Sequence, residues 1–165
     1  MSKLVLLALV AIALLFVGGC SLLQQQGPPL QNWQPVLSPD GTSIAYASPG
    51  DKGFELYTRD LATDEVKQLT KNEVDDWEPN WSPQGDQLVY VSNQDKNVDL
   101  YVIVLSTLAI TRLTSQEGED VNPTWGADGK ILFNSNRSGS WEIYRIDPDG
   151  KNLTQVTVPT STSSQ

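Results

Sequence analysis

Short apolar runs separated by polar turns recur along most of the chain at a nearly fixed interval. One kind of run is apolar on nearly every residue and occupies residues 44–48, 88–92 and 131–135. A second kind is rich in aromatic and β-branched residues and occupies residues 54–59, 98–103 and 141–146. Shorter, more polar stretches follow at residues 66–70, 110–114 and 153–157. Runs of this length and composition are typical of β-strands.

Equivalent positions lie 44 residues apart, and 43 apart after Gly129. The repeat is marked by a proline near the start of each unit (Pro35, Pro79 and Pro123) and a threonine at its end (Thr70, Thr114 and Thr157). A further strand beside each proline leads into a turn, which in the first unit is Ser-Pro-Asp-Gly at residues 38–41 and favours type I geometry. Four strands per unit at this interval predict an all-β fold of three propeller blades over residues 32–157.

The first twenty residues follow a different pattern. Lys3 precedes an apolar run over residues 4–17, which is shorter than the roughly 20 residues of a membrane-spanning helix and fits a signal peptide. Two glycines then lead to Cys20, the only cysteine. This stretch resembles a bacterial lipobox, although an ordinary signal peptide followed by a chance cysteine is the alternative. The predicted organisation is therefore a lipoprotein signal peptide (1–19), a flexible polar tether (20–31), the blades, and a disordered Ser/Thr tail (158–165).

The lipobox resemblance implies lipid attachment at Cys20. Acyl chains on that residue would anchor the protein to a membrane of the cell envelope without spanning it. With Ser21 next to the cysteine, the resemblance implies the outer membrane, facing the periplasm, if the cell is Gram-negative.

Charge and composition exclude several functions. The chain has 20 acidic and 11 basic residues and a net charge of −9, which argues against nucleic-acid binding because phosphates need a basic surface. It has no histidine, which excludes a Ser-His-Asp triad, a Cys-His pair and a His-ligated metal. No phosphate-binding loop or metal-ligand cluster is recognisable. We therefore expect no cofactor, no metal and no catalytic activity.

Several stretches resemble the repeat of TolB-type propellers. They are residues 79–83 (PNWSP), 88–92 (LVYVS), 99–101 (DLY) and 135–139 (SNRSG). The resemblance covers residues 32–157 and implies a propeller. It implies little about function, because the same repeat also builds propellers of prolyl-oligopeptidase-like enzymes. TolB-type proteins carry an α/β domain and six blades, and the peptidases carry a hydrolase domain. Neither domain pattern is recognisable here.

Three blades leave an architectural question, because closed propellers have four to eight. The two end blades would each expose an apolar face, and exposed apolar patches mark interaction sites. Three outcomes are open. Two copies could pair head-to-tail into a six-bladed ring, a different propeller fragment could complete the ring, or the faces could stay open.

Candidate binding residues cluster just before each repeated proline. Asn32, Asp76 and Asp120 each precede a proline by three positions, and Asp75 and Glu119 lie beside them. These residues could ring a channel mouth and attract a cation or a basic peptide. Alternatively, they cap the turn through backbone N–H groups.

Two tryptophans lie in the same loops. Trp33 and Trp77 are equivalent residues that could anchor a partner, stack on a sugar, or pack between blades. We expect Trp81 and Trp125 in the core and Trp141 packed within its sheet.

These patterns predict a membrane-anchored, non-catalytic protein-interaction module of the bacterial cell envelope. Its partner would be an envelope protein or a second copy that completes the propeller. The alternative is a small-molecule or glycan binding protein that uses Trp33, Trp77 and the acidic loops.

Overall fold

The computed structural model describes residues 33–157, which belong to one compact unit, Gln31–Gln165. The predicted signal peptide, Cys20, the tether, Asn32 and the tail lie outside the described residues. The described part consists of strands, turns and loops, and it contains no helix that could cross a membrane.

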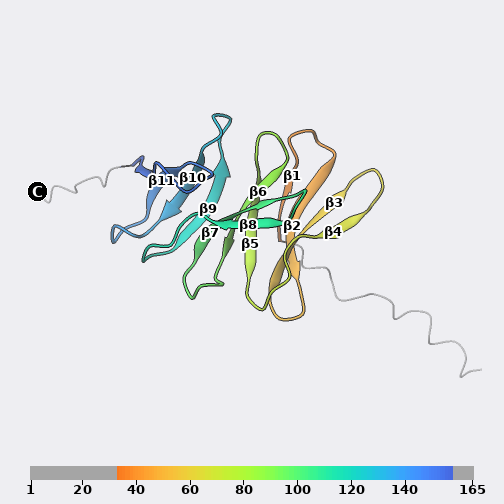
Figure 1. Cartoon of the computed structure of the whole chain (residues 1–165), viewed down its shortest axis with the longest axis horizontal. Helices are drawn as coiled ribbons and strands as arrows, with labels where there is room; N and C mark the ends of the chain where they lie inside the picture. The colour runs from red at the N-terminus through yellow and green to blue at the C-terminus, as the bar shows by residue number, and fades with distance from the viewer. Residues whose placement is uncertain (1–32, 158–165) are drawn as a thin grey trace, which may run out of the picture. The chain divides into compact units, whose positions relative to one another are not determined.

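The twelve strands form three antiparallel sheets of four, each in chain order (Figure 1). Blade 1 comprises β1 (Trp33–Leu37), β2 (Ser43–Pro49), β3 (Phe54–Asp60) and β4 (Val66–Gln68). Blade 2 comprises β5 (Asp76–Trp81), β6 (Gln87–Ser92), β7 (Asp99–Val104) and β8 (Ala109–Arg112). Blade 3 comprises β9 (Asp120–Trp125), β10 (Ile131–Ser135), β11 (Glu142–Ile146) and β12 (Thr154–Gln155). The predicted all-β fold of three four-stranded blades is confirmed.

The turn between the first two strands of each blade has the predicted geometry. In blade 1 the N–H of Gly41 donates to the carbonyl of Ser38 at 2.9 Å, and Gly41 has a φ of 73°. Glycine accepts this left-handed conformation without steric cost. The equivalent bonds of Gly85 and Gly129 measure 2.9 and 3.0 Å. The repeated glycine is therefore explained by the turn.

The outer strands are shorter than predicted because a side chain replaces the backbone ladder at their ends. The hydroxyl oxygen of Thr70 accepts the N–H of Leu56 at 2.9 Å, where a strand carbonyl would otherwise accept. Thr114 does the same for Leu100 at 3.0 Å, and Thr157 for Ile143 at 2.8 Å. The repeated threonine therefore ends each blade.

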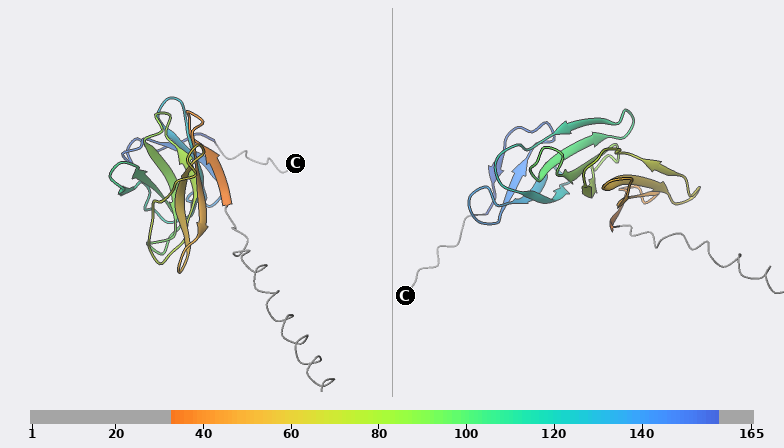
Figure 2. Two further views of the ribbon diagram at one scale, coloured as in Figure 1. Left: turned by 90° about the vertical axis from the view of Figure 1, so that its right-hand side faces the viewer. Right: turned by 90° about the horizontal axis from the view of Figure 1, so that it is seen from below.

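The three blades follow one another along the chain, as the ribbon shows (Figure 2). Two apolar clusters lie between adjacent blades. The cluster between blades 1 and 2 contains buried Ala45, Ala47, Leu56, Leu69, Trp81, Leu88, Tyr90, Tyr101 and Ile103. The cluster between blades 2 and 3 contains buried Val89, Val91, Leu100, Val102, Leu113, Ile131, Phe133, Tyr144 and Ile146. Both faces of blade 2 are thus covered, which explains why its two middle strands, β6 and β7, are apolar on most residues.

Candidate functional site

The first strands of blades 1 and 2 form a pocket of about 320 Å³. Three of the predicted binding residues line it: Trp33, Asp75 and Trp77. The other lining residues, which were not predicted from the sequence, are Gln34, Ala47, Phe54 and Glu78. The pocket is formed because β1 and β5 pack side by side, so residues 44 positions apart come together.

The two equivalent tryptophans differ in environment. Trp77 is half-buried and packs against both interblade clusters, as expected for a residue that fills the space between blades. Trp33 is 54% exposed, and its ring meets the Phe54 ring edge-on at 5.8 Å. Trp33 therefore offers apolar surface to a ligand or partner, and Trp77 forms the pocket wall.

The acidic loop residues hold the backbone in place. A carboxylate oxygen of Asp75 accepts the N–H of Phe54 at 2.9 Å, linking the loop before blade 2 to blade 1. Its own N–H donates to the side chain of Asn93 at 3.0 Å. The N–H of Glu119 donates to the side chain of Asn136 at 2.7 Å, and Glu119 itself is exposed.

Asp76 and Asp120 lie inside the protein and do not ring an open channel. Asp120 is bound by the Arg137 guanidinium at 2.8 and 2.7 Å, and that guanidinium lies 5.0 Å from the Tyr144 ring centroid. Asp76 accepts a hydrogen bond of 2.8 Å from the side chain of Asn72. Burial raises the pKa of Asp76 because it disfavours the charged form, and the bond from Asn72 opposes this shift.

A chain of hydrogen bonds links the first strands of all three blades. Gln34, Glu78 and Asn122 are equivalent, have φ of 53°, 54° and 53°, and lie in β-bulges beside the repeated proline. The N–H of Glu78 donates to the Gln34 side chain at 2.8 Å, and the N–H of Asn122 donates to the Glu78 carboxylate at 2.6 Å. Only their spacing of 44 residues could have revealed these positions in the sequence.

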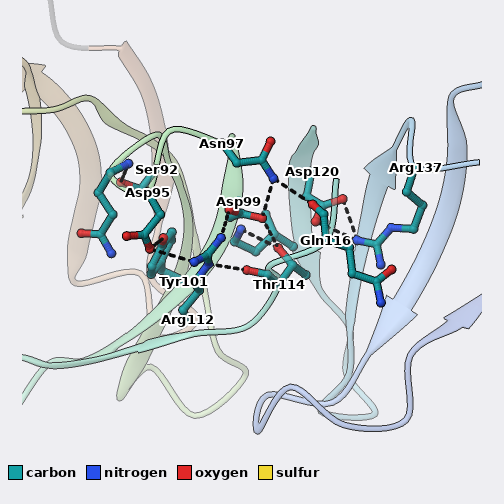
Figure 3. Close-up of polar contacts among 12 residues, drawn as sticks. Ser92, Asp95, Asn97, Asp99, Tyr101, Arg112, Thr114, Gln116, Asp120 and Arg137 are labelled. Carbon is teal, nitrogen blue, oxygen red and sulfur yellow. Dashed lines mark hydrogen bonds and ion pairs between the residues drawn. The ribbon is translucent and has the colours of Figure 1, made fainter. Parts of the chain in front are cut away.

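A charged cluster lies in blade 2 at the start of β7 (Figure 3). The guanidinium of Arg112 contacts buried Asp99 at 2.6 Å and Asp95 at 3.0 Å. The hydroxyl of Tyr101 also donates to Asp95, at 2.8 Å. Burial raises the pKa of Asp99, and Arg112 opposes that shift. Burial and the bond to Asp95 raise the pKa of Tyr101 to about 12.

The outer faces of blades 1 and 3 expose residues whose equivalents are buried. On blade 3, Leu132 and Ile143 are 37% and 38% exposed, whereas Val89 and Leu100 in blade 2 are fully buried. Trp141 and Val156 are also exposed there. On blade 1 the exposed residues are Leu37 and Leu61; the counterpart of Leu37, Trp81, lies in the first cluster, and that of Leu61, Leu105, packs against it. The prediction that Trp141 packs within its sheet is wrong, because the described residues provide no blade beyond its face.

Comparison with known proteins supports this architecture. The family model described as TolB beta propeller domain matches residues 22–165. A putative TolB from Agrobacterium tumefaciens is 30% identical, with a TM-score of 0.68 over 74% of this chain and 44% of its own. TolB from Acinetobacter baumannii is 28% identical, with a TM-score of 0.71 over 79% of this chain and 33% of its own.

A puromycin-hydrolysing peptidase from Mycobacterium tuberculosis shares the fold. It is 16% identical, with a TM-score of 0.65 over 78% of this chain and 22% of its own. No curated protein sequence matches the chain. The chain spans less than half the length of these solved relatives. The matched family model covers most of the sequence, and the chain therefore belongs to the TolB beta propeller domain family.

Proposed function

We propose that the protein is a membrane-anchored, non-catalytic interaction module of the bacterial cell envelope, and that its partner is a second copy of the same chain. The observation that carries this proposal is the pair of exposed end faces on blades 1 and 3. An exposed apolar face of this kind is an interaction site in soluble proteins.

The repeat itself indicates which partner fits. The junctions between blades 1 and 2 and between blades 2 and 3 use the same positions on each side. The outer face of blade 3 carries the positions with which blades 1 and 2 each contact the next blade. The outer face of blade 1 carries the positions with which blades 2 and 3 each contact the previous blade. Blade 1 of a second copy therefore presents the positions that blade 3 is built to contact, with Arg59 and Arg145 at the positions of Ile103 and Val102 on the two faces.

The hydrogen-bond chain supports the same pairing. At its end, the Asn122 side chain makes no hydrogen bond within residues 33–157, and at its start the Gln34 N–H has no side-chain acceptor there. These are the two groups that would meet at a third junction. Two copies would give six blades, within the four to eight of closed propellers, whereas three copies would give nine. The expected assembly is a two-fold symmetric dimer.

Sedimentation of residues 20–165 carrying Cys20→Ser tests the assembly. The expected mass at micromolar concentration is that of two chains. Ile143→Glu places a charge in the proposed junction and should give one-chain mass with a folded circular-dichroism spectrum. Glu65→Gln, at an exposed site in the turn between β3 and β4, should remain dimeric. A wild-type mass of one chain would contradict the proposal.

The membrane anchor is tested separately. In bacteria that produce the full chain, the protein should fractionate with membranes and incorporate labelled palmitate. Cys20→Ser should abolish both, because a single thiol would carry the lipid. Persistent labelling of the variant would show that Cys20 is not the attachment site.

One observation favours the alternative of small-molecule or glycan binding. The 320 Å³ pocket combines the exposed Trp33 ring with Trp77 and two acidic residues, Asp75 and Glu78. Aromatic faces with a few polar groups are typical of ligand sites. Calorimetric titration with soluble cell-wall fragments discriminates between the functions: saturable heat that is lost in Trp33→Ala would favour the alternative.

A further inference from the structure

Blade 1 repeats the charged cluster of blade 2 with two differences, an aspartate replaced by a glutamate and the arginine replaced by a glutamine. The four residues of the blade 2 cluster are Asp95, Asp99, Tyr101 and Arg112. Forty-four positions earlier, blade 1 has Asp51, Glu55, Tyr57 and Gln68. Both acids and the tyrosine are retained, and the arginine is replaced by a neutral glutamine.

The guanidinium of Arg112 has two kinds of contact. Its Nε donates to the carbonyl of Thr114 at 2.7 Å, and its outer nitrogens contact Asp99 and Asp95. In blade 1, Nε2 of Gln68 donates to the carbonyl of Thr70 at 2.8 Å, which reproduces the first contact. Glutamine has no further nitrogen with which to reach the acids.

The consequence is an unbalanced buried carboxylate. Glu55 is 1% exposed, and its Oε1 accepts the N–H of Asn72 at 2.7 Å. Its Oε2 is buried and has no hydrogen-bond partner among the described residues. Burying a carboxylate without a positive partner costs free energy, because the charge loses its hydration. Binding of a cation beside Glu55 would offset that cost.

An open groove of about 650 Å³ lies at this position. Asp51, Glu55, Tyr57 and Gln68 line it, as do three exposed charged residues, Lys52, Lys71 and Glu73. Lys52 and Glu73 form an ion pair with each other. Lys71 is the remaining base at the rim, and it makes no ion pair within residues 33–157.

From this internal comparison we infer that the groove binds the guanidinium group of an arginine side chain presented by a partner polypeptide. Blade 2 shows how a guanidinium is held between two such acids, one of which also accepts a hydrogen bond from the tyrosine hydroxyl. A planar guanidinium can contact both carboxylates through separate nitrogens, which an ammonium group cannot match. A metal is less suitable, since residues 33–157 contain no group of three acidic, cysteine or histidine ligands placed to hold one.

The inference rests on the proposed protein-binding role, and of the four residues compared only Tyr57 has its counterpart, Tyr101, in the cluster between blades 1 and 2. In blade 2 the Arg112 and Asp95 side chains remain 31% and 47% exposed although blade 1 packs against that blade. A blade packed in the same way against the outer face of blade 1 would therefore leave the groove accessible.

NMR titration of residues 20–165 carrying Cys20→Ser tests the inference, with the backbone amide of Asn72 as the reporter. Nα-acetyl-arginine amide should give saturable shifts at Asn72. Nα-acetyl-lysine amide should bind about tenfold more weakly, and the neutral citrulline derivative should not bind. Free arginine should bind more weakly than the blocked derivative. Tighter binding of the free amino acid would overturn the assignment to a polypeptide.

Two variants make the test specific. Gln68→Arg supplies the missing guanidinium from within, so it should raise the melting temperature and abolish binding. Glu55→Gln should abolish binding even if the first variant folds poorly. As a matched control, Arg112→Gln should open a second, equivalent site in blade 2 and raise the stoichiometry.

Absence of saturable shifts, or binding unaffected by Gln68→Arg and Glu55→Gln, would overturn the inference. The sedimentation mass separates this result from the proposed self-association. A chain of one-copy mass that binds the arginine derivative contradicts only the dimer, and a dimer that does not bind it contradicts only the groove.

Discussion

The Glu78 carboxylate accepts a hydrogen bond of 2.6 Å from the backbone N–H of Asn122, its counterpart in the next blade. The same relationship joins Gln34 to the N–H of Glu78 at 2.8 Å. Each link satisfies a backbone donor that the β-bulge turns away from its own sheet. The links therefore couple neighbouring blades through the backbone, in addition to apolar packing.

Removing this link should weaken the junction between blades 2 and 3. Glu78→Ala is expected to lower the free energy of unfolding by about 1–2 kcal/mol, because the N–H of Asn122 loses a charged acceptor. Chemical denaturation measures the change. Glu65→Ala is the matched control, since this exposed glutamate side chain makes no hydrogen bond or ion pair within residues 33–157, and it should leave the stability of the single chain nearly unchanged.

Equivalent residues on covered and uncovered faces should differ in their contribution to stability. Leu100→Ala removes a fully buried side chain between blades 2 and 3 and should cost about 2–5 kcal/mol. Ile143→Ala, at the same position of blade 3, should cost the single chain about 0.5 kcal/mol. Chemical denaturation of both variants, at a protein concentration below the dissociation constant of the dimer, compares the two losses of stability. Equal losses would mean that the face of blade 3 is covered within the chain.

Arg137 should be essential because it balances a buried acid. Arg137→Met leaves Asp120, which is 1% exposed, without its partner and should cost about 3–5 kcal/mol. Adding Asp120→Asn to the same chain removes the unpaired charge and should recover much of the loss. Thermal melts of the single and double variants measure this. A double variant as unstable as Arg137→Met would show that lost packing on Tyr144 dominates.

Asp76 and Asp40 should give opposite pH dependences. Burial raises the pKa of Asp76 above its ordinary value of 3.8, so the folded state holds that proton more tightly than the unfolded chain. Its contribution is therefore largest below pH 3.8 and is lost as pH rises through the raised pKa. Asp76→Asn should remove this loss and raise the melting temperature at neutral pH.

Asp40 provides the control of opposite sign. The hydroxyl of Ser38 donates to it at 2.6 Å and lowers its pKa, so its contribution is present above pH 3.8 and is lost as pH falls through the lowered value. Asp40→Asn should reduce the dependence of the melting temperature on pH in the acidic range and leave that dependence unchanged at higher pH. Melting temperatures measured across the acidic range check both variants, and identical profiles would contradict the assignments.

The candidate site was only partly visible in the sequence. Trp33, Asp75 and Trp77 could be identified because they are large or charged residues in a repeated loop, and they do line one pocket. The burial of Asp76 and Asp120 was not visible, since it depends on Asn72 and Arg137 folding back from other parts of the chain. The inward turn of Arg112 onto Asp99 was not visible either.

The blade count, the strand order and the turns follow from the sequence alone. Each of these depends on local preferences that recur every 44 residues, such as glycine at positive φ and proline in a bulge. Which copies of a repeated position are covered, and which acids are balanced, is determined only when the blades pack. Those properties depend on the neighbouring blade and on contacts between distant residues, so identical positions in the repeat acquire different environments.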